Sequence, residues 1–314
     1  MRVNKGKQIR VTLGQPGRNH LASFCTILSF FGVLTSLTLI AVGAAIHLLI
    51  GTYAMLLDKY NGSYLTFILV GIGLAGVAVH CLLIFLLVDF TNEERAEHFG
   101  KVCLAVLTCA LLTLIAGIIC FTHIAQVKAS FKSGIFNGIK NYKNSTAMKT
   151  AIDEVQIQYQ CCGVKGYEDW FSIQWSNESV ADKAKIEKKR VKSIYHSDDV
   201  PFSCCKAASM RPCIHEALQT NGHHYNYDFR KNVTVHTTGC LAKLATFFGP
   251  GLLFIMGILI CSISLLDTAI GLSTRLLYTS LQSALEAGDQ FGPGVGLLLP
   301  GDIEPYEPPT APPR

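Results

Sequence analysis

Charged side chains are scarce in this sequence. Asp, Glu, Lys and Arg make up 16% of the 314 residues, against about 25% in soluble domains, and half of the residues are hydrophobic. The formal net charge of +5 is small and is scattered among apolar runs. This composition excludes an ordinary soluble enzyme, and nucleic-acid binding is excluded because no large basic surface is indicated. We interpret the chain as an integral membrane protein.

Four apolar runs are long enough for a membrane-spanning helix, which needs about 20 residues. They cover residues 21–49, 64–88, 102–124 and 244–272, and Asp267 is their one charged residue. Strands of a transmembrane barrel would instead alternate apolar and polar residues over about ten positions. The runs therefore predict an all-α membrane protein with four transmembrane helices.

Acidic residues are absent from the first 20 residues, which contain five cations. The positive-inside rule places this N-terminal segment in the cytoplasm, and four spans return the C-terminus to the same side. The first run is too long for a signal peptide and lacks a cleavage site after it. The remaining segments are then a small outer loop (50–63), a cytoplasmic loop (89–101), a large outer domain (125–243) and a cytoplasmic tail (273–314).

Glycosylation sequons and clustered cysteines both fall on the side predicted to be outside. The sequon asparagines are Asn61, Asn144, Asn177 and Asn232. Six of the twelve cysteines lie in the large outer domain: Cys161, Cys162, Cys204, Cys205, Cys213 and Cys240. An even set in an oxidising compartment predicts disulfides, although their pairing is left open. A zinc site is disfavoured because no two pairs of ligands have zinc-site spacing.

The outer domain shows one clear helical pattern and one weak one. Apolar residues recur at helical spacing over residues 148–159, which predicts a helix that ends at Cys161-Cys162-Gly163. Residues 125–142 contain Ile135 and Ile139 among lysines and glycines, so they indicate a continuation of the third span only weakly. Adjacent cysteines do not bond comfortably to each other, so the doublet is expected to send two bridges in different directions.

Tryptophan occurs only twice, and both indoles lie in one short aromatic stretch with Phe171. Trp170, Phe171 and Trp175 are therefore candidate contacts in an oligomer, and the alternative is that each ring belongs to the domain's own core.

An acid inside the fourth span requires a reason, because a charge in hydrocarbon is costly. Asp267 is either part of an ion path or a polar contact between helices. The second interpretation is favoured, because a transporter usually has several such groups. Small residues such as Gly32 with Ser36, and Gly71 with Ala75, predict close helix packing.

Other features indicate no chemistry. Cys25 and Cys103 lie near predicted cytoplasmic span ends, and they are either palmitoylated or buried free thiols. No combination of nucleophile, base and orienting group is evident, and phosphate-binding loops are absent outside the lipid. We therefore expect no enzymatic activity, cofactor, metal or small-molecule substrate.

The four spans with a large second outer loop containing Cys-Cys-Gly resemble the tetraspanin family. The match is closer to the branch of peripherin and rod outer segment membrane protein. It rests on these motifs: Cys161-Cys162-Gly163, Gly166 to Trp175, Val200 to Cys205, Arg211-Pro212-Cys213-Ile214, Tyr225-Asn226-Tyr227-Asp228 and Gly239-Cys240.

This resemblance implies the bridges Cys161–Cys240, Cys162–Cys204 and Cys205–Cys213. It also implies a non-catalytic protein that oligomerises, with itself or a related tetraspanin, through the outer domain to shape curved membrane at photoreceptor disc rims. The plasma membrane is a second possible location. The alternative function is a tetraspanin adaptor that binds and traffics a receptor or adhesion protein.

Two departures from that branch change what is expected. Thr146 stands where photoreceptor members have a cysteine that links oligomers covalently, so non-covalent assembly is expected here. The tail is shorter, and from Gln282 onward it is rich in Gly and Pro, which predicts disorder and a possible polyproline ligand.

Overall fold

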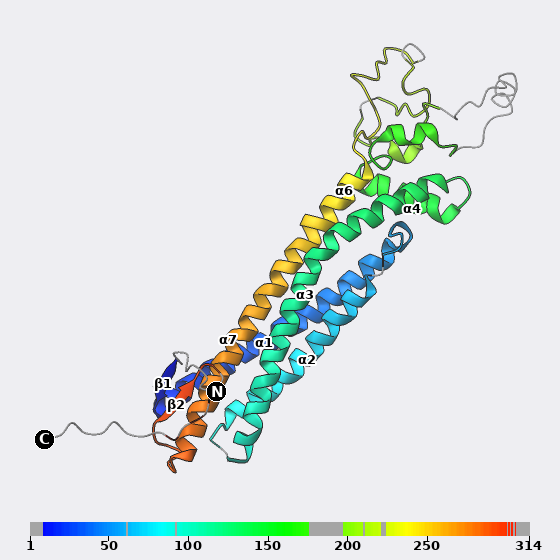
Figure 1. Ribbon diagram of the computed structural model, residues 1–314. Coiled ribbons are helices and arrows are strands. Elements are labelled where there is room, and N and C mark those ends of the chain that lie inside the picture. Colours follow the sequence, from blue (N-terminus) through cyan, green and yellow to red (C-terminus); the bar gives the residue numbers. More distant parts are fainter. Residues whose placement is uncertain are drawn as a thin grey trace, which may run out of the picture. The chain divides into compact units, whose positions relative to one another are not determined.

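The computed structural model (Figure 1) describes residues 9–60, 62–91, 93–175 (backbone only for 93–97), 197–209, 211–220, 224–299, 301, 303 and 305. The elements in chain order are β1 (Arg10–Leu13), α1 (Gln15–Thr52), the 3-10 helix η1 (Ala54–Leu56), α2 (Ser63–Val88), α3 (Glu93–Lys140), α4 (Thr146–Tyr159), the 3-10 helices η2 (Tyr167–Ser172) and η3 (Phe202–Cys204), α6 (Cys240–Thr246), the π-helix η4 (Phe247–Leu253), α7 (Phe254–Glu286) and β2 (Gly294–Leu297).

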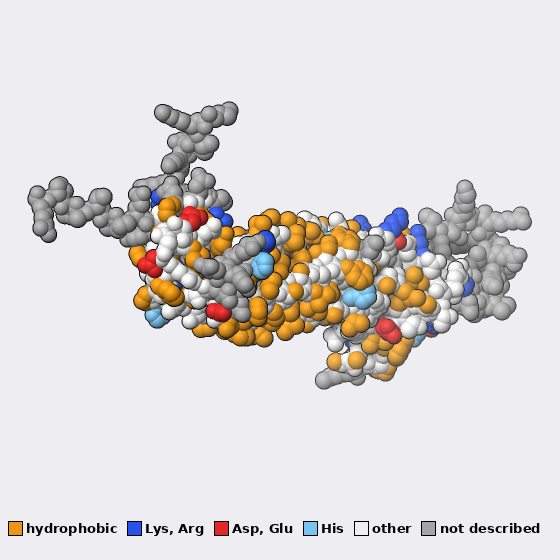
Figure 2. All heavy atoms as spheres, turned by 90° about the horizontal axis from the view of Figure 1, so that it is seen from below, with side chains coloured by type: hydrophobic (Ala, Val, Ile, Leu, Met, Phe, Trp, Pro, Cys, Tyr) orange, Lys and Arg blue, Asp and Glu red, His pale blue; other side chains and the backbone are white. Residues whose placement is uncertain are grey.

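Among the described residues, four helical segments are long and apolar enough to cross a membrane: α1, α2, residues 98–140 of α3, and the continuous run of α6, η4 and α7. Many of their apolar side chains point outward, for example Phe30 at 57% exposure and Phe67 at 67%. Figure 2 shows hydrophobic side chains gathered over these helices with few charged ones among them. The predicted fold class, a four-span helical protein, is confirmed.

Three of the four spans extend well beyond their apolar runs, whereas α2 matches its run within one residue. The third run was predicted as residues 102–124, but α3 continues to Lys140 and already begins at Glu93, inside the predicted cytoplasmic loop. An apolar run indicates only which residues cross the hydrocarbon core of the membrane. The helix itself continues until its backbone hydrogen bonding is interrupted.

The chain divides into two compact units. The bundle unit comprises residues 1–46, 63–119 and 257–314, and the disulfide unit comprises residues 47–62 and 120–256. Each unit is described separately below.

In the bundle unit, a strand that precedes α1 pairs with a strand that follows α7. Strand β1 pairs antiparallel with β2, with Arg10 opposite Leu297 and Leu13 opposite Gly294. Arg18 of α1 is fully buried, and its guanidinium donates hydrogen bonds to the carbonyl oxygens of Gln290 and Gly292, both at 2.8 Å. The N-terminal segment therefore holds the chain that follows α7.

This arrangement corrects the predicted disorder of the tail (273–314) as far as residue 299. Helix α7 runs to Glu286, and β2 lies back along it, with Leu297 only 3% exposed. A side chain at Gly294 would collide with the carbonyl of Ser280. The glycines that suggested disorder thus permit close backbone contact, because glycine lacks a side chain. The proline-rich end, residues 306–314, lies outside the described residues.

In the disulfide unit, the small loop after α1 packs on the extension of α3. Ser130 Oγ donates a hydrogen bond to the Asp58 carbonyl at 2.7 Å, and Ser133 Oγ donates to the Asp58 carboxylate at 2.6 Å. A side chain at Gly134 would collide with the backbone of Leu56. The glycines that weakened the helical pattern of residues 125–142 are therefore contact positions of a continuous helix.

Helix α4 matches the predicted helix within two residues. Ser145 caps its start by accepting a hydrogen bond from the backbone N–H of Met148. Gln160 ends it in the left-handed conformation, with φ of 52°. Ile152 and Val155 face the core, as the apolar spacing predicts.

Candidate assembly surface of the disulfide unit

Three disulfides connect the segments that follow α4. They join Cys161 to Cys240, Cys162 to Cys204 and Cys205 to Cys213. These are the pairs that the family resemblance implies, and each doublet sends its two bridges in different directions. The loop after η3 is therefore fixed at both its ends.

The aromatic stretch forms the core of this unit. Trp170 is fully buried and Phe171 is 4% exposed. The Trp170 ring contacts Tyr142 edge-on at 5.1 Å and Trp175 at 6.0 Å between ring centroids. The prediction that Trp170 and Phe171 contact a partner directly is corrected, because burial within the unit leaves them no free surface. Trp175 is half-buried, and its indole N–H donates to the Asp199 carbonyl at 3.2 Å.

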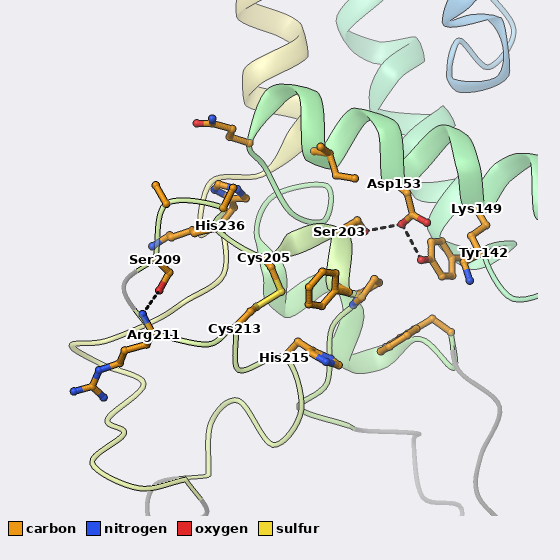
Figure 3. A pocket seen from close by; sticks show the side chains of 18 residues that line it. Tyr142, Lys149, Asp153, Ser203, Cys205, Ser209, Arg211, Cys213, His215 and His236 are labelled. Atoms are coloured by element: carbon orange, nitrogen blue, oxygen red, sulfur yellow. Dashed lines mark hydrogen bonds between the residues drawn. A yellow bond between two sulfur atoms is a disulfide. The ribbon is translucent and has the colours of Figure 1, made fainter.

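A polar network ties this core to η3. The Asp153 carboxylate accepts hydrogen bonds from the hydroxyls of Tyr142, at 2.8 Å, and Ser203, at 2.6 Å (Figure 3). With its amide oriented to satisfy its neighbours, Gln156 donates to Ser203 and accepts from the Trp170 indole N–H. Burial, with the adjacent Asp153 carboxylate, raises the pKa of Tyr142 well above its ordinary value. The network holds the turn after α3, α4, η2 and η3 in a fixed arrangement.

A groove of about 1160 Å³ opens beside this network (Figure 3). Its apolar rim carries Ile157 of α4, 65% exposed, and Phe202 of η3, 71% exposed, and Trp175 also lines it. Large exposed apolar side chains that border a hollow are typical of protein contact sites.

The groove is also basic. Its described lining contains Lys149, Lys206 and Arg211 together with His215 and His236, and Asp153 is the one carboxylate among these lining residues. Burial lowers the pKa of His236 below its ordinary value, and the positive charges of Lys206 and Lys243 lower it further. The groove therefore suits a partner surface with apolar and acidic side chains.

Sequence patterns gave no prediction for Ile157 or Phe202. Ile157 lies off the buried stripe of α4, which contains Ile152 and Val155. An apolar residue on the polar face of an amphipathic helix is the signal that would have identified it.

Comparison with known proteins places the fold in a family. The family model described as "Tetraspanin family" matches residues 21–279. The chain belongs to the tetraspanin family.

Relatives of this tetraspanin include peripherin-2 of Rattus norvegicus, which is 28% identical over 94% of this chain and 89% of its own length. Photoreceptor outer segment membrane glycoprotein 2 of Gallus gallus is 27% identical over 93% of this chain and 84% of its own. Peripherin-2 of Xenopus laevis is 30% identical over 58% of this chain and 56% of its own. This tetraspanin is therefore a multi-pass integral membrane protein of the peripherin-like branch.

In the bundle unit of this tetraspanin, Asp267 of α7 lies 3.3 Å from Nε2 of His80 on α2, and both side chains are almost fully buried. The His80 ring packs against Gly32 of α1, so three helices meet at this pair. The contact fits the interpretation of Asp267 as a polar link between helices. The sequence did not identify His80 as the partner, because residues 187 positions apart share no local pattern.

The remaining candidate residues vary in exposure. Cys25 and Cys103 are buried, which matches the free-thiol alternative for both. Asn144 and Asn232 are exposed and available for glycosylation, whereas Asn61 and Asn177 lie outside the described residues. Thr146 is exposed at the start of α4. Within the described residues, no group of three or more His, Cys, Asp or Glu side chains is placed to hold a metal.

Proposed function

We propose that this tetraspanin is a non-catalytic structural protein that assembles with itself or a related tetraspanin and thereby shapes or stabilises highly curved membrane. The observation that carries the proposal is the groove rimmed by Ile157 and Phe202. Because the rim is fixed by a disulfide and a buried polar network, docking onto it would require little ordering of the surface.

In the proposed orientation, both termini are cytoplasmic and the disulfide unit is extracellular or lumenal. The cation-rich N-terminus supports this orientation, and so do the three disulfides, which require an oxidising compartment. Peripherin-like relatives, one of them named for the photoreceptor outer segment, support a location in disc membrane.

The size of the protein in mild detergent tests the proposal. We expect oligomers for the natural chain on native gels, and monomers on non-reducing denaturing gels because Thr146 supplies no linking thiol. Phe202→Ser and Ile157→Ser remove the apolar rim. Each is expected to weaken association about 30-fold, as at a central interface contact.

Tyr225→Ser is the matched control, because Tyr225 is 92% exposed but does not line the groove. Undiminished oligomers from the double variant Ile157→Ser with Phe202→Ser would contradict assembly through this groove. A monomeric natural chain that purifies with one stoichiometric foreign partner would support the adaptor function instead.

Reconstitution tests the curvature part of the proposal. At rising protein-to-lipid ratio, the natural chain is expected to convert large vesicles into narrow tubules or small vesicles. The double rim variant, inserted to the same density, is expected to leave vesicle diameter unchanged. Equal remodelling by both proteins would show that assembly through the groove does not bend the membrane.

A further inference from the structure

Two adjoining cavities in the disulfide unit lie along the part of α3 that follows its apolar run. The larger, of about 610 Å³, extends to η4, and the smaller, of about 420 Å³, lies farther along α3. They share Val164 and Lys165, so they form one continuous groove. It is distinct from the groove rimmed by Ile157 and Phe202, with which it shares no lining residue.

The larger cavity has an apolar wall. Ile124 of α3, Leu241 and Ala245 of α6, and Pro250 of η4 line it. η4 is a π-helix, in which the N–H of Phe254 bonds to the carbonyl of Gly249 five residues earlier. Pro250 has no N–H, and a π-turn is wider than an α-turn, so the backbone departs from a regular helix where it borders the cavity.

The groove also carries three cations. Lys128 and Lys132 are four residues apart on one face of α3, and Lys165 faces them from the segment after the cysteine doublet. All three lysines are exposed, and no carboxylate of the described residues pairs with them. Asp169 also lines the smaller cavity, and its carboxylate already accepts hydrogen bonds from the backbone N–H groups of residues 164, 165 and 166, at 2.9, 2.6 and 3.2 Å.

The order of these groups along α3 matches the layers of a bilayer. The predicted apolar run of α3 ends at Ile124, and the first charged residue after it is Lys128, four residues or about 6 Å of helix farther on. A headgroup layer is roughly 5–8 Å thick on each side of the hydrocarbon. The apolar wall therefore lies at the depth of acyl chains and glycerol, and the ammonium groups lie at the depth of phosphates.

We propose that this groove binds an anionic phospholipid of the leaflet next to the disulfide unit. The headgroup phosphate lies between Lys128 and Lys165, and the upper acyl chains lie against Ile124, Ala245 and Pro250. A membrane protein that oligomerises through another surface would thus also hold a specific lipid at its boundary. This proposal does not rest on the proposed assembly through the Ile157 and Phe202 rim.

The test measures lipid retained by the full chain. The protein is reconstituted into phosphatidylcholine nanodiscs that contain phosphatidylglycerol as a minor component, transferred to mild detergent, and its retained lipids are counted by mass spectrometry. The natural chain is expected to be enriched in phosphatidylglycerol. Lys128→Glu with Lys165→Glu is expected to reduce that enrichment by at least fivefold for each lysine.

Two further variants make the result specific. Lys140→Glu changes an exposed lysine of the same helix that lines neither cavity, and it is expected to retain phosphatidylglycerol as the natural chain does. Ala245→Trp fills the apolar wall while the lysines remain, and it is expected to lose the lipid.

Equal loss in the Lys140 variant, or equal retention of phosphatidylcholine and phosphatidylglycerol by the natural chain, would overturn the proposal. So would a lysine double variant that keeps its lipid but changes its size on native gels, because the groove would then be covered by a second copy. Unchanged tryptophan emission confirms that each lysine variant is folded, since both natural tryptophans lie in this unit. Ala245→Trp adds a third tryptophan, so its fold is checked by circular dichroism instead.

Discussion

The core of the disulfide unit contains large aromatic side chains and disulfide-bonded cysteines. In the bundle unit, by contrast, the helices approach one another closely at small residues. Trp170 fills the centre of the first, between Tyr142 and Trp175. In the second, a side chain at Gly73 would lie 2.7 Å from Ile40, and one at Gly32 would lie 2.6 Å from the His80 ring.

The difference reflects the two surroundings. Outside the membrane, burial of an aromatic ring away from water stabilises a fold, and disulfides restrict the unfolded chain. Within lipid, apolar side chains gain little by leaving the acyl chains, so helices associate through close van der Waals contact and a few polar bonds. The following predictions test this contrast, from the largest expected effect to the smallest.

Trp170→Ala should destabilise the disulfide unit most. Loss of a fully buried indole leaves a large cavity, and such substitutions cost about 3–5 kcal/mol. Emission of the remaining Trp175 during denaturant titration measures the effect on this unit alone. Phe202→Ser, at an exposed position, should change the unfolding free energy by less than about 0.5 kcal/mol. Similar losses from both would show that the aromatic core is not the main source of stability.

Replacing Cys161 and Cys240 together by serine should cost about 2–5 kcal/mol, because this bridge closes a loop of 79 residues. Both tryptophans report the unfolding, and Cys109→Ser, in the bundle unit, is the control. A double variant as stable as the control would mean that packing alone specifies the disulfide unit.

Arg18→Ala should release β2 from the bundle unit without unfolding its helices. It removes the hydrogen bonds that one guanidinium nitrogen, Nη2, shares between two backbone carbonyls, and a hydrogen bond from a charged donor is worth about 1.5–3 kcal/mol. Amide hydrogen exchange at Val295 and Leu297 should accelerate at least tenfold. Asn19→Ala, at the adjacent exposed position, should leave exchange unchanged. Unaltered protection in the Arg18 variant would mean that strand pairing alone holds the tail.

The His80–Asp267 pair should contribute modestly, since polar contacts between membrane helices average about 0.6 kcal/mol and reach about 1.7 kcal/mol. A double-mutant cycle with His80→Ala and Asp267→Ala, followed by unfolding in mixed detergent micelles, measures their coupling energy. A coupling above about 3 kcal/mol would contradict the view that close packing dominates the bundle unit.

The smallest effect concerns pH. The folded state lowers the pKa of His236, so its unfolded pKa of about 6.5 lies higher. Protonation therefore favours the unfolded chain, and stability that is complete above pH 6.5 should fall as the pH drops through the window below it. His236→Gln should flatten this dependence in tryptophan-detected unfolding at pH 5 to 7. If the unfolding free energy of the variant changes with pH as steeply as that of the natural chain, the pH dependence arises from other groups.

Local patterns predicted the elements of this protein well and their contacts poorly. The four apolar runs and the helix of residues 148–159 appear in the structure because hydropathy and helical spacing act over neighbouring residues. The expected small-residue contact at Gly71 with Ala75 was wrong, since Gly71 faces open space and Gly73 makes the contact. Which face of a helix meets its neighbour depends on the neighbour.

The sequence by itself determined the number of spans, the cysteine-rich segment between the last two, and the family. The spans depend on the composition of continuous stretches, which sets how much apolar surface must leave water, and the other two features depend on short motifs that are read along the chain. Only the tertiary structure decided that Trp170 lies in the core, that Phe202 rims a groove, that His80 meets Asp267, and that the tail returns along α7. These outcomes depend on steric fit and hydrogen bonding between residues far apart in the chain, and no local pattern encodes them.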